Sequence, residues 1–268
     1  MMPHSPDAAP ILFFDSGIGG LSVLRAVKAA LPNAPIVFAA DYAGLPYGSK
    51  TEAEISARVP ALLGRLVERY RPRLVTIACN TACTIALAHV RAALDVPVVG
   101  TVPAIKPAAE ASKTGVIGLI GTAATVRQGY VDRLHADHAA HMTLLRHAAP
   151  ELVAAAEAKM RGEAVDPSVY IRAMGGLTEQ EGGDRLDVTV LGCTHFPLVE
   201  DELRAVAPHM QFVDGAAGIK RRISHLTRDQ RWPEAQTEGI LVTTGPLDAL
   251  ESLRPALSRF GLSQIKSL

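Results

Sequence analysis

Short runs of apolar, often β-branched residues recur along the chain, and each ends at a small or polar residue that precedes a stretch with helical spacing. The runs are ILFF at 11–14, IVFAA at 36–40, LVTIA at 74–78, VIGLI at 116–120 and DVTVL at 187–191, with VPVVG at 96–100 and QFVD at 211–214 as further buried strands. Strands that alternate with helices of roughly ten to fifteen residues are typical of parallel βαβ units whose sheets are covered on both faces. The sequence therefore predicts an α/β fold.

The chain of 268 residues is long enough for two compact domains or for one large α/β domain. The stretch around Pro97, Pro103 and Pro107 is one plausible crossing point between domains, and the Asp214-Gly215 segment is another. We place a second domain between them.

The charge balance excludes several classes of partner. The 27 basic and 27 acidic side chains cancel, so the chain has no general attraction to nucleic acid or to an anionic membrane surface. The first ten residues lack the basic start and apolar stretch of a secretory signal, and the later apolar runs are too short to span a bilayer. We expect a cytoplasmic protein that binds a small molecule.

Reactive side chains follow directly after several of the predicted strands. In open parallel sheets ligands bind beyond the carboxyl ends of the strands. Asp15, Cys79 and Cys193 fall at these positions, and the polar residues beside them are Ser16, Asn80, Thr81, Thr122 and Thr194. This arrangement predicts an active site assembled from several strands.

The two strand-end cysteines lie in similar segments, LVTIACNTA at 74–82 and VTVLGCTHF at 188–196. The likeness indicates an internal duplication, which would bring one thiol to each wall of a cleft between domains. Both segments continue with polar residues typical of a helix start, and a helix N-terminus favours the thiolate. A single buried cysteine is usually only a small hydrophobic residue, but two matched copies favour a functional role.

The third cysteine, Cys83, has no polar pattern of its own, and we interpret it as structural. A zinc site built from Cys79, Cys83, Cys193 and His195 has suitable ligand types. Its spacing differs from that of the usual paired ligand motifs, so we expect no metal.

Asp15 precedes a glycine-rich turn containing Gly17, Gly19 and Gly20. The dinucleotide pattern G-x-G-x-x-G fails because Ser22 occupies the last glycine position. A loop that binds a substrate carboxylate through backbone amides fits better, with Asp15 handling a proton or an ammonium group. The alternative role for Asp15 is an ordinary helix N-cap.

His195 lies two residues after Cys193 and is the only one of the nine histidines beside a strand-end cysteine. Because histidine titrates near neutral pH, it can orient that thiol or share a proton with it.

Five motifs together resemble the glutamate racemase family, within the aspartate/glutamate racemase superfamily. They are DSGIGG at 15–20, LPYGSKT at 45–51, ACNTA at 78–82, GTAATV at 121–126 and LGCTHFPL at 191–198. Their order and spacing cover nearly the full chain, and the CTHFP segment resembles glutamate-specific rather than aspartate-specific members.

The resemblance implies two α/β domains with mainly parallel sheets flanked by helices, and an active site in the cleft between them. It implies that residues 1–102 and 213–268 form the first domain and 103–212 the second. Cys79 and Cys193 are then the catalytic thiols, with Asp15 assisting the first and His195 the second. The residues implied to hold the substrate's carboxylates and ammonium are Asp15, Ser16, Tyr47, Gly48, Asn80, Thr81, Thr194 and His195.

Two positions depart from the family pattern. The segment that usually ends in a glutamate supporting the second cysteine is APELVAAAE here, which makes Glu157 the match and Glu151 a competitor. Gln128 stands where a serine is common, which bears on substrate positioning rather than on the reaction.

The expected reaction is racemisation of glutamate without a cofactor. An α-proton must be removed from one face and returned to the other, which requires a base and an acid on opposite sides of the α-carbon. The resemblance further implies supply of D-glutamate for peptidoglycan, and we expect a homodimer. The competing hypotheses are an aspartate or hydantoin substrate on the same fold, a zinc-stabilised binding module, and purely structural thiols.

Overall fold

The computed structural model describes residues 8–127 and 129–268, which divide into two compact units. One unit contains the described chain as far as Thr101 together with Ala216–Leu268, and the other contains Val102–Gly215. Each unit has a parallel sheet flanked by helices, which confirms the α/β fold class.

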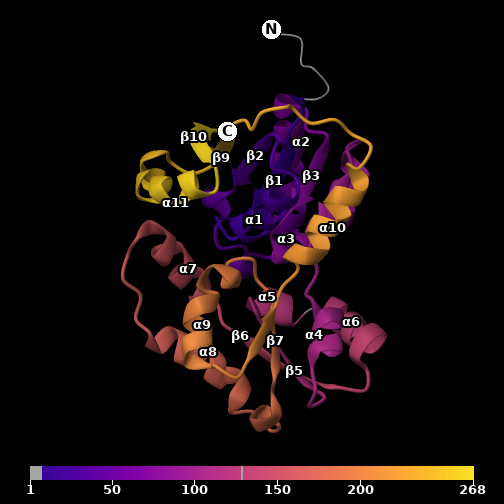
Figure 1. Ribbon diagram of the computed structural model, residues 1–268, viewed down its shortest axis with the longest axis vertical. Coiled ribbons are helices and arrows are strands. Elements are labelled where there is room, and N and C mark those ends of the chain that lie inside the picture. The colour runs from indigo at the N-terminus through magenta and orange to yellow at the C-terminus, as the bar shows by residue number, and fades with distance from the viewer. Residues whose placement is uncertain (1–7, 128) are drawn as a thin grey trace. The chain divides into compact units, whose positions relative to one another are not determined.

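The first unit contains a six-stranded parallel sheet with the order β10-β9-β2-β1-β3-β4. The strands are β1 (Ile11–Asp15), β2 (Ile36–Ala40), β3 (Leu74–Ile77), β4 (Val98–Gly100), β9 (Gly239–Thr243) and β10 (Leu262–Ser267). The last two strands, yellow in Figure 1, extend the sheet beside the indigo β1 and β2. The C-terminal segment is therefore part of the first unit's sheet.

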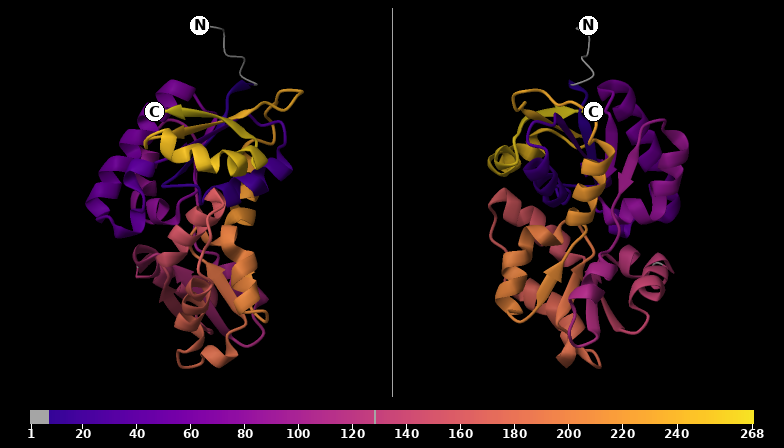
Figure 2. Two further views of the ribbon diagram at one scale, coloured as in Figure 1. Left: turned by 90° about the vertical axis from the view of Figure 1, so that its left-hand side faces the viewer. Right: turned by 45° about the vertical axis from the view of Figure 1, so that its right-hand side comes forward.

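Helices cover this sheet, and every residue of β1, β2 and β3 is buried. The helices are α1 (Leu21–Ala30), α2 (Glu52–Tyr70), α3 (Asn80–Ala93), α10 (Ala216–Leu226) and α11 (Arg254–Arg259), with the 3₁₀ turns η2 (Tyr42–Gly44), η3 (Tyr47–Ser49) and η6 (Asp248–Leu253). Helix α1 packs on α10, and α2 packs on α3. The side view in Figure 2 shows α11 lying along the yellow strands.

The second unit contains a four-stranded parallel sheet with the order β6-β5-β7-β8. Its strands are β5 (Val116–Gly121), β6 (Thr143–Ala148), β7 (Val188–Leu191) and β8 (Gln211–Val213). Its helices are α4 (Ile105–Ala111), α5 (Ala123–Val126), α6 (Gly129–Ala139), α7 (Glu151–Arg161), α8 (Ser168–Thr178) and α9 (Glu200–Val206), with the 3₁₀ turns η4 (Gly183–Arg185) and η5 (Phe196–Val199). Helix α4 packs against α6, and α7 against η5.

The carboxyl ends of the central strands bring polar residues to one edge of each sheet. In the first unit the Asp41 amide donates to the carbonyl of Asp15 at 2.9 Å, and the Ala78 amide donates to the carbonyl of Phe14 at 2.8 Å. In the second unit the Gly192 amide donates to the carbonyl of Ile120 at 2.7 Å. Parallel pairing therefore places the strand-end residues predicted from the sequence side by side within their own unit.

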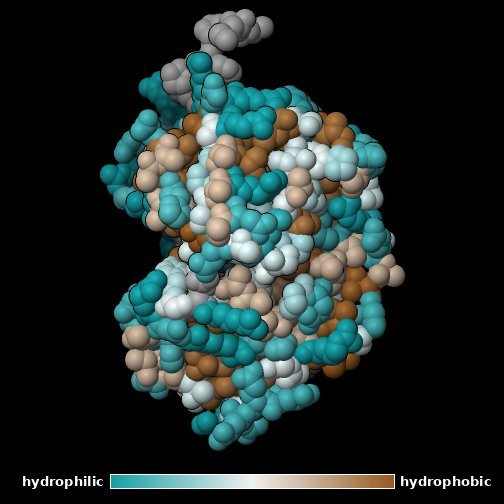
Figure 3. All heavy atoms as spheres, turned by 180° about the vertical axis from the view of Figure 1, so that it is seen from behind, coloured by the Kyte–Doolittle hydropathy of each residue, from teal (hydrophilic) through white to brown (hydrophobic). Residues whose placement is uncertain are grey.

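The surface agrees with the even charge balance. Hydrophilic side chains are spread among apolar ones on the face seen in Figure 3. Among the helices that the structure describes, none is long and apolar enough to cross a membrane.

Candidate functional site

Cys79 is the N-cap of α3 in the first unit. Its thiol is buried, and Sγ accepts a hydrogen bond from the amide of Ala82 at 3.5 Å. The positive end of a helix dipole stabilises a nearby anion, so this position favours the thiolate over the thiol. The residue follows β3 closely, as the sequence pattern predicts, with only Ala78 between Cys79 and the strand end at Ile77.

Ser16 links this thiol to a buried carboxylate. Ser16 Oγ lies 3.9 Å from Cys79 Sγ and donates to Asp15 Oδ1 at 3.3 Å. The amide of Gly17 donates to the same oxygen at 3.1 Å, and Asp15 is fully buried. Helix α1 has Gly20 as its N-cap, so the alternative that Asp15 is an ordinary helix cap is wrong.

The residues that the family resemblance assigns to substrate binding in this unit are buried or half-buried. Asn80 and Thr81 lie in the first turn of α3, and the Oδ1 atom of Asn80 has no hydrogen-bond partner among the described residues. A buried acceptor without a partner is costly, which makes it suited to a ligand's N–H donor. Gly48 lies in η3 and is half-buried.

Tyr47 has a different environment from the one expected of a substrate ligand. Its hydroxyl donates to Asp41 Oδ2 at 2.6 Å, and the residue is 1% exposed. Burial and the charge of Asp41 raise the pKa of Tyr47 above its ordinary value, so the hydroxyl keeps its proton. The Tyr47 side chain therefore ties its loop to Asp41 at the end of β2.

The second unit carries an analogous chain of polar contacts. His195 Nδ1 lies 3.9 Å from Cys193 Sγ, and Nε2 lies 3.1 Å from Glu157 Oε1. Burial alone lowers the pKa of His195, but the hydrogen bonds and charges of Cys193 and Glu157 outweigh it and hold the pKa well above its ordinary value. This shift favours the protonated imidazole, and a protonated imidazole beside the thiol favours the thiolate. Thr194 is buried next to it.

Glu157, rather than Glu151, makes this contact. Glu157 lies in the middle of α7 and is 7% exposed, whereas Glu151 is half-buried in the first turn of that helix. Gln128 lies outside the residues that the structure describes.

The prediction that a helix begins directly after Cys193 is wrong. The chain instead forms a 3₁₀ turn at Phe196–Val199, and the α-helix begins only at Glu200. Pro197 lacks an amide proton, and the nearby amides of Phe196 and Leu198 bond three residues back, to the carbonyls of Cys193 and His195. The helix-dipole argument therefore holds for Cys79 alone, and His195 is the cation beside Cys193.

The sequence analysis did not identify three charged side chains next to these networks, which are Asp41, Arg58 and Arg161. Arg161 Nη2 lies 3.5 Å from Glu157 Oε2, and Arg58 forms a bidentate ion pair with Asp41. The i,i+4 spacing of Glu157 and Arg161 on one helix was a usable signal. Asp41 follows a predicted strand directly, but Arg58 is far from it in sequence, and no local pattern indicates their pairing.

Cys83 has the structural environment expected for it. Its Sγ donates to the carbonyl of Ile77 and accepts from the amide of Thr101, both at 3.1 Å. Burial raises the pKa of this thiol to about 12, so it stays protonated at neutral pH. In the part of the chain that the structure describes, no group of three His, Cys, Asp or Glu side chains is placed to hold a metal ion.

Comparisons with known proteins agree with the five motifs. The family model described as Asp/Glu/Hydantoin racemase matches residues 21–219. A protein named glutamate racemase from Sphingopyxis alaskensis is 60% identical over the whole of both chains. The crystal structure of Escherichia coli glutamate racemase in complex with L-glutamate and the activator UDP-MurNAc-ala is 38% identical, covers 97% of this chain and 98% of its own, and has a TM-score of 0.89. A glutamate racemase structure from Thermus thermophilus, in complex with β-chloro-D-alanine, is 29% identical, covers 99% of this chain and 97% of its own, and has a TM-score of 0.76. The chain therefore belongs to the Asp/Glu/Hydantoin racemase family.

Proposed function

We propose that this protein is a glutamate racemase that needs no cofactor and moves the α-proton between Cys79 and Cys193. The observation that carries the proposal is that each unit has one buried strand-end thiol with its own polar chain. Ser16 and Asp15 accompany Cys79, and His195 and Glu157 accompany Cys193. Relatives named glutamate racemase, one of them solved with L-glutamate, support glutamate as the substrate.

The mechanism needs one thiolate and one thiol at the start of each turnover. The thiolate removes the α-proton from one face, and the opposite thiol donates a proton to the other face, so that the two groups exchange states. Hydrogen-bond donors near the substrate carboxylate stabilise the developing carbanion. We assign removal of the proton from D-glutamate to Cys79 and from L-glutamate to Cys193.

The biological setting follows from the same proposal. D-glutamate is made for peptidoglycan, the enzyme works in the cytoplasm, and it assembles as a homodimer. The cytoplasmic location is supported by the three free cysteines, because thiols persist in a reducing compartment.

The test is incubation of the purified protein with L-glutamate in heavy water, with a chelator and no added cofactor. Optical rotation and the α-proton signal should decay together. Parallel incubations with aspartate and a hydantoin separate the neighbouring substrates. If glutamate keeps both signals while another substrate loses them, the substrate assignment is wrong. If all stay inert, the racemase proposal fails.

A further inference from the structure

Asp41 forms a buried polar network that the proposed reaction does not use. Its side chain has no solvent exposure and lies directly after β2, at the same sheet edge as Asp15. Both carboxylate oxygens accept two hydrogen bonds. Oδ2 accepts from Tyr47 Oη at 2.6 Å and Arg58 Nε at 2.5 Å, and Oδ1 accepts from Arg58 Nη2 and Thr244 Oγ1, both at 2.6 Å.

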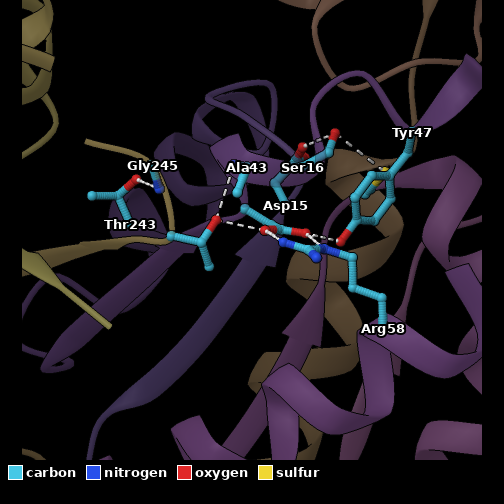
Figure 4. A network of polar contacts seen from close by, with 10 residues as sticks. Asp15, Ser16, Ala43, Tyr47, Arg58, Thr243 and Gly245 are labelled. Carbon is cyan, nitrogen blue, oxygen red and sulfur yellow. Dashed lines mark hydrogen bonds and ion pairs between the residues drawn. The ribbon is translucent and has the colours of Figure 1, made fainter. Parts of the chain in front are cut away.

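These partners come from three separate segments. Tyr47 lies in the loop 42–49, Arg58 lies in the second turn of α2, and Thr244 lies directly after β9. Figure 4 shows Tyr47 and Arg58 converging on the same acceptor. Thr244 Oγ1 also accepts from the amide of Ala43 at 3.0 Å, so the C-terminal segment contacts the loop directly.

The backbone hydrogen bonds within the 42–49 loop are short turn bonds. They run three residues back, from the amides of Gly44, Leu45, Ser49 and Lys50 to the carbonyls of Asp41, Tyr42, Pro46 and Tyr47. Such turns are weak on their own. The loop ends at a capping box between Thr51 and Glu54, which fixes the start of α2 but not the loop before it.

Two glycines allow the chain to pack closely around Asp41. A Cβ atom added at Gly44 would lie 2.5 Å from Asp41 Oδ2 and 2.9 Å from Arg58 Nε. A Cβ atom at Gly245 would lie 2.8 Å from Tyr42 Cβ. Both glycines therefore allow the loop and the C-terminal segment to approach the network.

The loop reaches the catalytic end of the unit. Turn η3 packs against α3, whose N-cap is Cys79, and Tyr47 belongs to the same buried cluster as Cys79. We propose that Asp41, Arg58 and Thr244 are positioning residues that hold the 42–49 loop in the conformation that binds substrate. The inference rests on the proposed function, because the loop's contact with glutamate belongs to that proposal.

The first measurement needs no substrate. Hydrogen exchange of the amides at 42–49 is compared among the wild type, Thr244→Val and Thr244→Ser. Valine keeps the shape of threonine but removes the hydroxyl. Loss of a hydrogen bond to a buried charge shifts the equilibrium between the held and the open loop by about tenfold or more. Exchange should be about tenfold faster in Thr244→Val and close to wild type in Thr244→Ser. Equal exchange in all three proteins would overturn the proposal.

The second measurement links the loop to catalysis. Arg58→Met removes two hydrogen bonds and leaves Asp41 as a buried charge without its cation, which opens the loop enough to lower the binding-competent fraction. The KM for both enantiomers should rise about tenfold while kcat stays within about threefold. Arg73→Met is the matched control, since Arg73 precedes β3 and its side chain donates to Ala9, Gln230 and Arg231, which lie outside the loop.

The outcomes separate this inference from the proposed function. Faster exchange in Arg58→Met with an unchanged KM would contradict the positioning role. A wild-type protein that does not racemise glutamate contradicts the proposed function alone, and the Thr244 pair then still decides whether the network holds the loop. The Thr244 pair also serves if Arg58→Met fails to fold.

Discussion

At the scale of single residues, the two thiols have different supports. Cys79 has a helix N-terminus and a serine that contacts a buried aspartate, whereas Cys193 has a charged histidine backed by Glu157. The two supports depend on different physics, one on peptide dipoles and one on an ionisable side chain. Substitutions in the second unit should therefore change the pH dependence of the reaction more strongly.

The Glu157 side chain should act through His195. In Glu157→Gln the imidazole loses its anionic partner and the pKa of His195 falls, so kcat should drop by at least about tenfold and the pH profile should shift towards acid. Arg161→Met should cause a smaller loss of kcat, through the position of the Glu157 side chain, without the acid shift. The measurement is the pH profile of kcat in both directions.

Arg204→Met is the control for Arg161→Met, since Arg204 also pairs with a glutamate four residues away, but on the exposed side of α9. Because two enantiomers have equal free energy in water, kcat/KM must stay equal in both directions in every variant. An unchanged pH profile in Glu157→Gln would contradict the role given to His195.

The Asp41 carboxylate should contribute to stability in a pH-dependent manner. Burial raises its pKa, but the hydrogen bonds from Arg58, Thr244 and Tyr47 outweigh burial and hold the pKa below its ordinary value. The stabilisation is present above the ordinary value of about 4 and is lost as the pH falls through the lowered pKa. Asp41→Asn should therefore unfold at a lower urea concentration than the wild type at pH 7. The difference between the two urea midpoints should become smaller in acid.

Fluorescence of Trp232, the single tryptophan, follows this transition in the first unit. If the difference between the urea midpoints of wild type and Asp41→Asn stays constant or increases as the pH falls, Asp41 is not stabilised in its ionised form.

At the scale of helices and strands, the glycine-rich turn is needed for packing. A Cβ atom added at Gly20 would lie 2.8 Å from Ala78 Cβ and 3.1 Å from Asp15 Oδ2, so α1 can begin here only because residue 20 has no side chain. Gly20→Ala should destabilise the protein by roughly 1–3 kcal/mol, as overpacking usually does, and lower activity by displacing Asp15.

Gly64→Ala is the matched control on α2. An added Cβ atom there meets no atom within 4 Å, so alanine should stabilise the helix by about 0.5–1 kcal/mol with unchanged activity. Thermal unfolding of both variants is the measurement, and equal effects of the two substitutions would refute the packing argument.

The elements recovered from the sequence are those with strong apolar runs. All seven predicted runs coincide with strands, because buried parallel strands are continuously apolar. Strands β6 and β10 were missed because they lie at sheet edges and are half-exposed, so their composition is mixed. Strand β9 was missed although it is central, because its apolar run is short, from Ile240 to Val242, and a long loop at 227–238 separates it from α10.

In the candidate site too, local sequence patterns predict some residues and not others. Strand ends predict where Asp15, Cys79 and Cys193 lie, and spacing alone places His195 beside Cys193. The pairing of Arg58 with Asp41 and of Glu157 with His195 depends on how helices pack on their sheets. Such long-range contacts leave no periodic trace in the sequence.

At the scale of the whole molecule, the C-terminal segment is essential to the first unit. Strand β9 lies between β10 and β2, and it is mostly buried. Removing residues 239–268 would expose the hydrogen-bonding edge of β2 and the apolar surface beneath it, and an exposed edge promotes aggregation. The truncated chain should be insoluble or unfolded, and a soluble truncated chain with native circular dichroism would contradict this topology.

The central claim is that each thiol serves one face of the substrate. The most direct measurement is α-proton exchange of each enantiomer in heavy water with Cys79→Ser and Cys193→Ser. Both variants should lose racemisation almost completely. Cys79→Ser should retain exchange only with L-glutamate, and Cys193→Ser only with D-glutamate. Near-normal racemisation by either variant, or exchange of the same enantiomer by both, would contradict the two-thiol mechanism.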